Sequence, residues 1–358
     1  MKSSYDPVSR GPYPVGVRSA ALLDASRADR RVELELWYPA AQACAGQDLS
    51  PQTQDRYSVF GAHLVTQEAV RDALPVGGQF PLLVFSHGMA GHRRQSTFLC
   101  THLASHGYVV VSPDHGGTTI ADLVALAMRV RSHEAPEDLE GLVAGYVFDR
   151  PRDIELILDA AESGALELPS SVDLSKVGLA GHSFGGFTAL VVAARDTRVG
   201  SVMALAPAGG SGPLASAAMV DELTLDFASR RVACLYLALE RDTMLPLAGI
   251  EQLFRRTPPP ARMFTLPNSD HMHFCDRAES SHEFFRKMPR LGIFGDLLGK
   301  IGPFAELVPA AFGYSFANGL CVAHADATLK DDARASAFLE RAVSEFAQLG
   351  IPVRDLSV

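Results

Sequence analysis

The sequence lacks the features of several large classes of protein. It has no run near the roughly 18 consecutive apolar residues that a membrane-spanning helix needs. Residues 1–7 show no basic start followed by an apolar stretch, which is the pattern of a secretory signal. The five cysteines are scattered, odd in number and free of CxxC spacing, so neither a disulfide framework nor a zinc site is predicted. We therefore expect a cytoplasmic protein whose thiols stay reduced.

An excess of basic charge is also missing. The 358 residues include 32 Lys and Arg against 41 Asp and Glu, which gives a net charge of −9. This balance argues against general binding to nucleic acid or to anionic membranes, and the basic pairs at 93–94 and 255–256 are too short to change it. Apolar residues make up 47% of the chain, enough for a sizeable core. A folded protein that acts on a small molecule is expected.

Apolar runs and helical patterns alternate along the chain. Residues 31–38 alternate apolar and polar side chains, which suits a half-buried antiparallel strand near a sheet edge, whereas the continuous apolar run 81–85 suits a strand covered on both faces. Further strands are predicted at 109–111, 177–180, 202–205, 232–239 and 263–266, and helices at 95–105, 151–163, 187–194, 247–255 and 331–349. This alternation predicts an α/β fold with a mainly parallel central sheet flanked by helices and joined by right-handed crossovers.

Two of the helices carry boundary signals. The helix at 151–163 is predicted to open with Asp149 as N-cap and Pro151 in its first turn. The helix at 331–349 is amphipathic, and Gly350 and Pro352 are expected to end it.

Two long segments, 118–146 and 277–319, do not follow the alternation. Both are partly helical and apolar, and we interpret them as possible cap elements over the active site of a single domain spanning residues 1–358. Their apolar content favours a hydrophobic substrate, with ordinary packing between helices as the alternative. The residues concerned are Leu123, Val124, Leu126, Ala127, Leu291, Ile293, Phe294, Leu297 and Leu298.

Residues 181–186, with the sequence GHSFGG, match the pattern G-x-S-x-G. A predicted strand precedes this pattern and a predicted helix follows it, which is the setting of a nucleophile on a sharp strand-to-helix turn. Ser183 would project its hydroxyl above the sheet, because Gly181 and Gly185 have no Cβ to collide with neighbouring chain. The alternative is a glycine-rich connection that happens to contain serine. We predict that Ser183 is the nucleophile.

Acyl transfer needs N–H donors aimed at the carbonyl oxygen as it becomes tetrahedral. The amide of Phe184, next to the nucleophile, is one predicted donor. The other is the amide of Met89, because Gly88 permits a tight turn after the strand 81–85. His87 and His92 could suggest a metal site, but no carboxylate or cysteine stands at matching spacing, so no metal is predicted.

A serine nucleophile needs a histidine base and a carboxylate that orients it, in the chain order Ser, Asp or Glu, His for this kind of sheet. Asp242 follows the strand 232–239 and is the favoured acid, with Glu240 as its rival. The loop after the strand 263–266 offers two histidines. We favour His271, 29 residues after Asp242, over His273. Asp196 ends the helix after the nucleophile and is expected to point away.

These motifs resemble a known family. Residues 85–88 (FSHG) together with 181–186 (GHSFGG) are similar to the platelet-activating factor acetylhydrolase-like branch of the α/β-hydrolases, which lies near the dienelactone hydrolases and the cutinase-like polyester hydrolases. Asp149-Arg150 with Asp153, and Trp37-Tyr38-Pro39, are similar as well, so the likeness covers roughly residues 10–275. The acetylhydrolases place their acid where this chain reads Leu205-Ala206-Pro207, and Asp242-Thr243 resembles the cutinase-like acid position instead.

The resemblance implies calcium-independent hydrolysis of carboxylic esters without a cofactor. It puts the nucleophile on Ser183 and the oxyanion donors on Met89 and Phe184. The leading hypothesis is thus an esterase or lipase working through an acyl-enzyme. A thioesterase, acyltransferase or peptide-bond hydrolase with the same triad is the alternative, and a non-catalytic ligand-binding member of the fold is a remote one.

Overall fold

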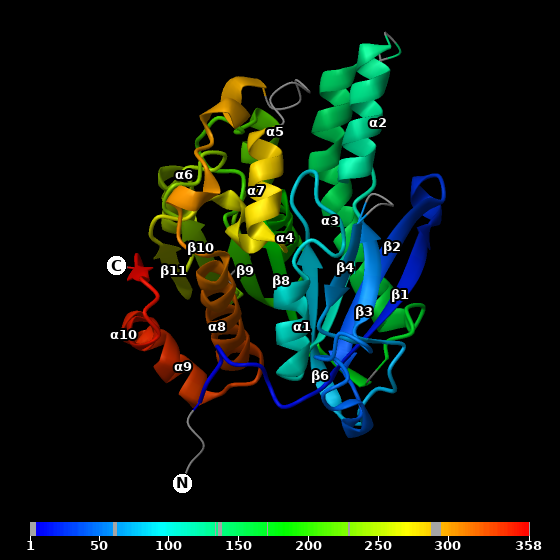
Figure 1. The fold of residues 1–358 in the computed structure, drawn as a ribbon. Helices are drawn as coiled ribbons and strands as arrows, with labels where there is room; N and C mark the ends of the chain where they lie inside the picture. The colour runs from blue at the N-terminus through cyan, green and yellow to red at the C-terminus, as the bar shows by residue number, and fades with distance from the viewer. Residues whose placement is uncertain are drawn as a thin grey trace.

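The structure is a computed structural model that describes residues 5–59, 63–132, 134, 138–169, 171–227, 230–287 and 295–357. A twisted sheet runs through the molecule and helices cover both of its faces (Figure 1). This is the α/β architecture that the alternation of apolar runs predicts.

Within the described residues, ten strands form the main sheet in the order β12-β11-β10-β9-β8-β6-β7-β2-β1-β5. The neighbours from β11 to β7 in this order run parallel, while β2 pairs antiparallel with both β7 and β1. A separate hairpin joins β3 and β4. The bounds are β1 Val15–Asp24, β2 Arg30–Pro39, β3 Asp55–Val59, β4 His63–Gln67, β5 Val70–Arg71, β6 Gln79–Ser86, β7 Val109–Pro113, β8 Ser171–His182, β9 Val199–Leu205, β10 Ala233–Leu239, β11 Ala261–Leu266 and β12 Arg354–Asp355.

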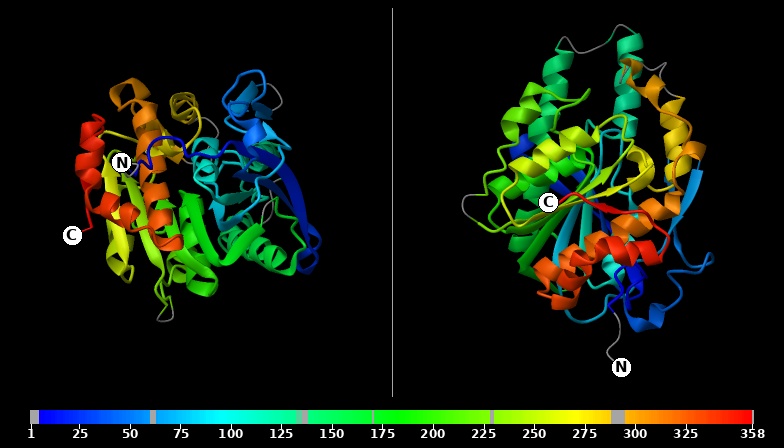
Figure 2. Two further views of the ribbon diagram at one scale, coloured as in Figure 1. Left: turned by 90° about the horizontal axis from the view of Figure 1, so that it is seen from below. Right: turned by 90° about the vertical axis from the view of Figure 1, so that its left-hand side faces the viewer.

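Helices cover the sheet in two layers (Figure 2). Helices α1 and α8 pack together on one face, and α3 and α4 pack together on the other. The bounds are α1 Thr97–Ser105, α2 Ile120–Arg131, α3 Leu139–Ser163, α4 Phe184–Arg195, α5 Ala217–Glu222, α6 Leu247–Arg256, α7 Ala278–Arg286, α8 Ala310–Leu329, α9 Ala333–Glu340 and α10 Ala342–Gln348, with short 3-10 turns η1 Ala25–Arg27, η2 Gln42–Cys44, η3 His271–Phe274, η5 Gly295–Lys300 and η6 Phe304–Glu306.

The predicted start of the helix at 151–163 is wrong. Helix α3 begins at Leu139, and its N-cap is Asp138, whose carboxylate accepts a hydrogen bond from the Gly141 amide at 2.7 Å. Asp149 and Pro151 therefore lie inside the helix. A proline removes only one intrahelical hydrogen bond, and packing of the long helix against its neighbours outweighs this local cost.

The predicted C-terminal helix is two helices. Asp331 has a left-handed backbone with φ of 54°, so α9 starts after it with Asp332 as its N-cap. The helix is then interrupted at Arg341, which ends α9 and precedes the first residue of α10. A strand that was not predicted, the two-residue β12, follows in the chain and pairs with β11 at the sheet edge.

The two predicted insertions differ in the structure. Segment 118–146 forms α2 and the first turns of α3, which rise beyond the sheet (Figure 1). Segment 277–319 contains α7, η5, η6 and the first half of α8. Helix α8 packs against β8, β9 and β10, so the boundary at 319 falls inside a core helix and not at the edge of a cap. Leu291, Ile293 and Phe294 lie outside the described residues.

Candidate active site

Ser183 occupies the sharp turn between β8 and α4. Its backbone has φ of 60° and ψ of −121°, a conformation that L-residues rarely adopt and that functional sites often retain. Steric crowding requires glycine at positions 181 and 185. A Cβ on Gly181 would lie 2.2 Å from the Gly185 carbonyl oxygen, and one on Gly185 would lie 1.8 Å from the Ser86 carbonyl oxygen. The turn therefore pushes the serine side chain out of the sheet edge.

A second turn, residues 87–91, follows β6 and lies beside the serine. We call it the oxyanion turn. A Cβ on Gly88 would come within 3.2 Å of the Ser183 Cβ. In the described part of the chain, the amides of Met89 and Phe184 donate no hydrogen bond to another protein group, in contrast to that of Gly88. Both amides thus remain available to an oxygen bound next to Ser183, although this use of them stays a prediction.

The structure brings the favoured acid and base together. The Asp242 Oδ2 atom lies 2.6 Å from His271 Nδ1, and both side chains are buried. The other carboxylate oxygen, Oδ1, accepts hydrogen bonds from the amides of Met244 and Leu245 at 2.9 and 2.8 Å. His271 opens η3, which Asp270 caps by accepting the His271 amide at 2.6 Å. The carboxylate and the imidazole therefore face each other in fixed orientations.

The surroundings of His271 shift its pKa. Burial lowers the pKa of this imidazole, but the charge of Asp242 and its hydrogen bond outweigh burial, and the net pKa is raised above 6.5. The same pair makes the imidazolium more stable than it would be in water. A base with this property can hold a proton taken from a hydroxyl.

The rival residues have other partners. Glu240 pairs with Arg354 and accepts the amide of Asn268 at 2.9 Å. His273 donates from Nε2 to the Val308 carbonyl oxygen at 2.9 Å and accepts the Asp270 amide at Nδ1 at 3.2 Å.

The remaining polar candidates also stay within the framework. Asp196 pairs with Arg198 at the end of α4. His87 contacts the Gly88 carbonyl oxygen through Nδ1 and accepts the His115 amide at Nε2. Among the described residues, no group of three His, Cys, Asp or Glu side chains is placed to hold a metal ion.

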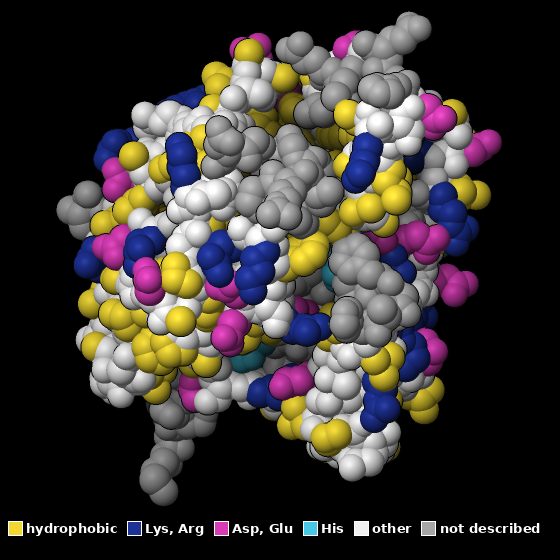
Figure 3. Space-filling view, turned by 45° about the horizontal axis from the view of Figure 1, so that its top comes forward, with side chains coloured by type: hydrophobic (Ala, Val, Ile, Leu, Met, Phe, Trp, Pro, Cys, Tyr) yellow, Lys and Arg dark blue, Asp and Glu magenta, His cyan; other side chains and the backbone are white. Residues whose placement is uncertain are grey.

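Ser183 and His271 both line one pocket of about 450 Å³. Hydrophobic side chains border a hollow on the face shown in Figure 3, and the apolar lining consists of Val65, Met89, Ala90, Ile120, Leu214, Met244, Met272, Phe284 and Phe285. Among the described residues, no hydrogen bond joins Ser183 Oγ to His271. Three elements outside the two turns also contribute to the walls: the β3–β4 hairpin, the start of α2, and α7.

A buried arginine lies beneath both turns, and our sequence reasoning gave it no role. The Arg150 side chain is 1% exposed, donates hydrogen bonds to the His87 carbonyl oxygen, Thr118 Oγ1 and Ser86 Oγ, and lies 4.5 Å from the centre of the Phe184 ring. Burial lowers the pKa of Arg150 to about 9. The guanidinium therefore braces the oxyanion turn and the residue after the nucleophile at once.

Arg150 belongs to a longer buried chain of hydrogen bonds. Asp153 Oδ2 lies 2.9 Å from His115 Nδ1, and His115 Nε2 lies 2.9 Å from Ser86 Oγ. The sequence signal was present, since Arg150 and Asp153 stand three residues apart and so lie on one face of a helix. The bonding partners of Arg150 lie 32 to 64 residues away in the sequence and carry no local signal.

Comparison with known proteins agrees with this architecture. The family model described as platelet-activating factor acetylhydrolase, isoform II, matches residues 22–138. The platelet-activating factor acetylhydrolase of Cavia porcellus is 28% identical over 162 residues, which are 37% of this chain and 36% of the relative. A Synechocystis protein whose name is that of a carboxymethylenebutenolidase is 26% identical over 227 residues, which are 60% of this chain and 86% of that protein.

Among solved structures, the ferulic acid esterase of Streptomyces cinnamoneus matches with a TM-score of 0.57 and 25% identity, over 89% of this chain and 91% of the esterase. The chain spans only 36% of the length of the first acetylhydrolase relative, and similar shares of the next two. Together with the serine turn, these matches show an α/β-hydrolase fold, and the chain is similar to the platelet-activating factor acetylhydrolase-like and dienelactone hydrolase-like branch of that fold.

Proposed function

We propose that this chain is a serine hydrolase that cleaves carboxylic esters through an acyl-enzyme. One observation carries the proposal: a strained serine and a histidine bonded to a buried aspartate line the same pocket. The names of the relatives, an acetylhydrolase, a butenolidase and an esterase, are all those of enzymes that act on ester bonds. Those names support the reaction class.

In the first half-reaction, His271 Nε2 takes the proton of the Ser183 hydroxyl as its oxygen attacks the ester carbonyl carbon. The carbonyl oxygen gains negative charge, and the amides of Met89 and Phe184 donate hydrogen bonds to it. The C–O bond to the alcohol then breaks. The proton held on His271 passes to the leaving oxygen, and the acyl group stays on Ser183.

In the second half-reaction, water replaces the alcohol. His271 takes a proton from water as the hydroxide oxygen attacks the acyl carbon, and the proton returns to Ser183 Oγ as the acid leaves. Asp242 accepts the hydrogen bond of His271 Nδ1 and stabilises the imidazolium across the 2.6 Å contact. Each active-site group ends the cycle in its starting state.

The apolar lining favours esters with hydrophobic acyl or alcohol groups. Phe284 and Phe285 come from α7, Met244 from the loop after β10 and Met89 from the oxyanion turn, so both sides of the scissile bond would meet apolar surface. A screen of p-nitrophenyl esters of graded chain length measures this preference. A flat profile from acetate to dodecanoate would contradict an apolar acyl site.

The test of the reaction is the variant Ser183→Ala. We expect loss of ester turnover with an unchanged circular dichroism spectrum, and loss of labelling by a fluorophosphonate that reacts with the wild-type serine. Ser163→Ala, an exposed position at the end of α3, serves as the control and should keep both signals. Retained turnover in Ser183→Ala would refute the proposal. Absence of labelling in folded wild-type protein would favour a ligand-binding member of the fold.

Matched ester, thioester and amide substrates with the same acyl group measure the choice of acyl donor. The proposal expects the ester to have a kcat/KM well above that of the amide. A higher kcat/KM for the thioester would change the substrate class and leave the triad unaffected.

A further inference from the structure

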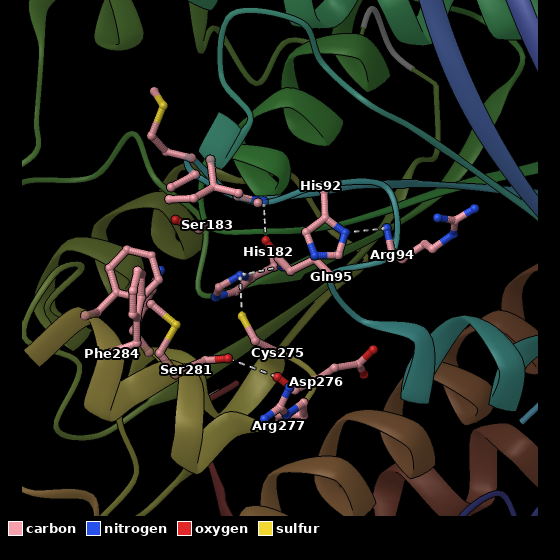
Figure 4. Close-up of a pocket in the computed structure, with 18 of the residues that line it drawn as sticks. His92, Arg94, Gln95, His182, Ser183, Cys275, Asp276, Arg277, Ser281 and Phe284 are labelled. Atoms are coloured by element: carbon pink, nitrogen blue, oxygen red, sulfur yellow. Dashed lines mark hydrogen bonds between the residues drawn. The ribbon is translucent and has the colours of Figure 1, made fainter. Parts of the chain in front are cut away.

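Gln95 lies just before α1 and touches two parts of the proposed site that are far apart in the sequence. Its side-chain oxygen accepts a hydrogen bond from the Gly88 amide at 3.0 Å. Its side-chain nitrogen lies 3.1 Å from His182 Nδ1, the residue before the nucleophile. Figure 4 shows Gln95 and His182 side by side in the pocket wall. One carboxamide thus connects the oxyanion turn to the nucleophile turn.

These contacts determine which way the carboxamide points. A backbone amide can only donate, so the atom facing Gly88 must be the oxygen of Gln95. The nitrogen then faces His182 and donates to its Nδ1, which must be unprotonated. The proton of the neutral imidazole therefore sits on Nε2.

Gln95 in this orientation keeps His182 neutral, since a proton on Nδ1 would confront the N–H of the carboxamide. Burial lowers the pKa of His182 well below 6.5, and the neighbouring His271 lowers it further. The Cys275 thiol also lies 3.8 Å from Nδ1, a position from which its S–H can donate. A neutral His182 leaves the positive charge of the catalytic cycle to His271 alone.

His182 in turn packs against the proposed base. Its ring centre lies 4.4 Å from that of His271 and 5.9 Å from that of Phe274. The position of Gln95 itself is tightly held, because its carbonyl oxygen accepts the Asp276 amide at 2.8 Å and a Cβ on Gly91 would lie 2.2 Å from its side-chain oxygen. A shift of the Gln95 carboxamide would therefore displace both the oxyanion turn and, through His182, the imidazole of His271.

We propose that Gln95 is a positioning residue for ester hydrolysis, one that holds the oxyanion turn and the imidazole of His182 in register with Ser183. By occupying the Gly88 amide, Gln95 leaves the next amide, that of Met89, to face the substrate oxygen. Gln95 does not exchange protons with the substrate. The inference rests on the proposed function, because it assigns Gln95 a part in the same reaction.

The test compares three variants. Gln95→Met keeps the length of the side chain and removes its hydrogen bonds to Gly88, His182 and Ser96, while Gln95→Glu keeps an oxygen for the Gly88 amide. Gln67→Met is the matched control, because Gln67 is also a buried glutamine and its side-chain hydrogen bonds, to Trp37 and Asp55, lie away from the serine. All three are first checked for folding by circular dichroism and thermal unfolding.

We expect Gln95→Met to lower kcat by about 10- to 100-fold, somewhat less than loss of a direct oxyanion donor, with KM changed by less than about threefold. Gln95→Glu should recover only the part of that loss that comes from the Gly88 contact, because its second oxygen would face His182 Nδ1 and favour a protonated imidazole. Gln67→Met should keep kcat near the wild-type value. The affinity for a trifluoromethyl ketone, which forms a tetrahedral adduct with the serine, should fall in Gln95→Met by the same factor as kcat/KM.

Three results would overturn the assignment: a folded Gln95→Met with wild-type kcat, equal rates for Gln95→Met and Gln95→Glu, or an unchanged affinity for the ketone while kcat/KM falls. Each of these leaves the proposed function intact so long as the wild type hydrolyses esters and is labelled at Ser183. Wild-type inactivity and a lack of labelling would instead refute the proposed function.

Discussion

Replacing Asp242 by asparagine probes the contact that orients the proposed base. The Oδ1 atom of Asp242 accepts two backbone amides, those of Met244 and Leu245. Those amides can only donate, so the carboxamide oxygen of the substituted side chain must take the Oδ1 place. Its NH₂ group is then forced toward His271 Nδ1, where the wild type has an acceptor at 2.6 Å.

This forced orientation reverses the tautomer of His271. Nδ1 would have to accept a hydrogen bond, and the ring proton would move to Nε2, the atom that must take the serine proton. Where a carboxamide imposes the wrong tautomer on a catalytic histidine, kcat falls by about 10⁴. That factor corresponds to about 5.4 kcal/mol of activation free energy at about 1.36 kcal/mol per tenfold change.

The assay is the steady-state hydrolysis of a p-nitrophenyl ester at pH 8 for Asp242→Asn. The control is Glu240→Gln, the same chemical change on the neighbouring carboxylate, whose partners are Arg354 and the Asn268 amide. We expect the control to keep kcat within about threefold, because an exposed ion pair contributes about 0–1 kcal/mol to stability. A folded Asp242→Asn enzyme within tenfold of wild type would refute this reasoning.

Two further predictions follow from the geometry of the site. We expect kcat/KM to fall as the pH falls through the pKa of His271, because the imidazole must be neutral to accept the serine proton. Burial lowers this pKa, but Asp242 raises it by more, so the midpoint of the pH profile should lie above 6.5. A midpoint below 6.5 would contradict the role of the His271–Asp242 pair, 2.6 Å apart, as the base. Gly185→Ala should sharply lower the melting temperature or the soluble yield, because the new Cβ would lie 1.8 Å from the Ser86 carbonyl oxygen. The control is Gly145→Ala in helix α3, where no atom lies within 4 Å of the new Cβ, and it should raise the free energy of unfolding by about 0.5–1 kcal/mol. Equal effects of the two changes on thermal unfolding would show that the close contact at Gly185 does not limit stability.

The parts of the site that sequence reasoning reached have local signals. The turn at Ser183 is marked by glycines that no other residue could replace, and the strand before it by a continuous apolar run. Asp242 and His271 each stand just after a predicted strand, and neighbouring parallel strands bring such positions to one edge. Their choice over Glu240 and His273 rested on chain order, and the 2.6 Å contact joins the favoured pair.

The parts that were missed depend on contacts between distant segments. Gln95 forms a hydrogen bond with His182, 87 positions away, and Arg150 forms one with His87, 63 positions away. No local sequence pattern predicts either contact. The start of α3 was misplaced because Pro151 is a strong local signal that tertiary packing overrides. The β3–β4 hairpin was missed because it pairs with itself, outside the main sheet, and lacks a long apolar run.

Helix α8 has a consequence for how the protein is assembled during synthesis. Every residue of the proposed site, from the oxyanion turn to His271, precedes Ala310 in the chain. Yet α8 shields β8, β9 and β10 from water on one side, and its Asp326 receives hydrogen bonds from the hydroxyls of Tyr5 and Tyr108. A nascent chain that already contains every residue of the site would still have these strands exposed to water on the face that α8 covers. We therefore expect the pocket to become rigid only after α8, which contributes no catalytic group, has left the ribosome.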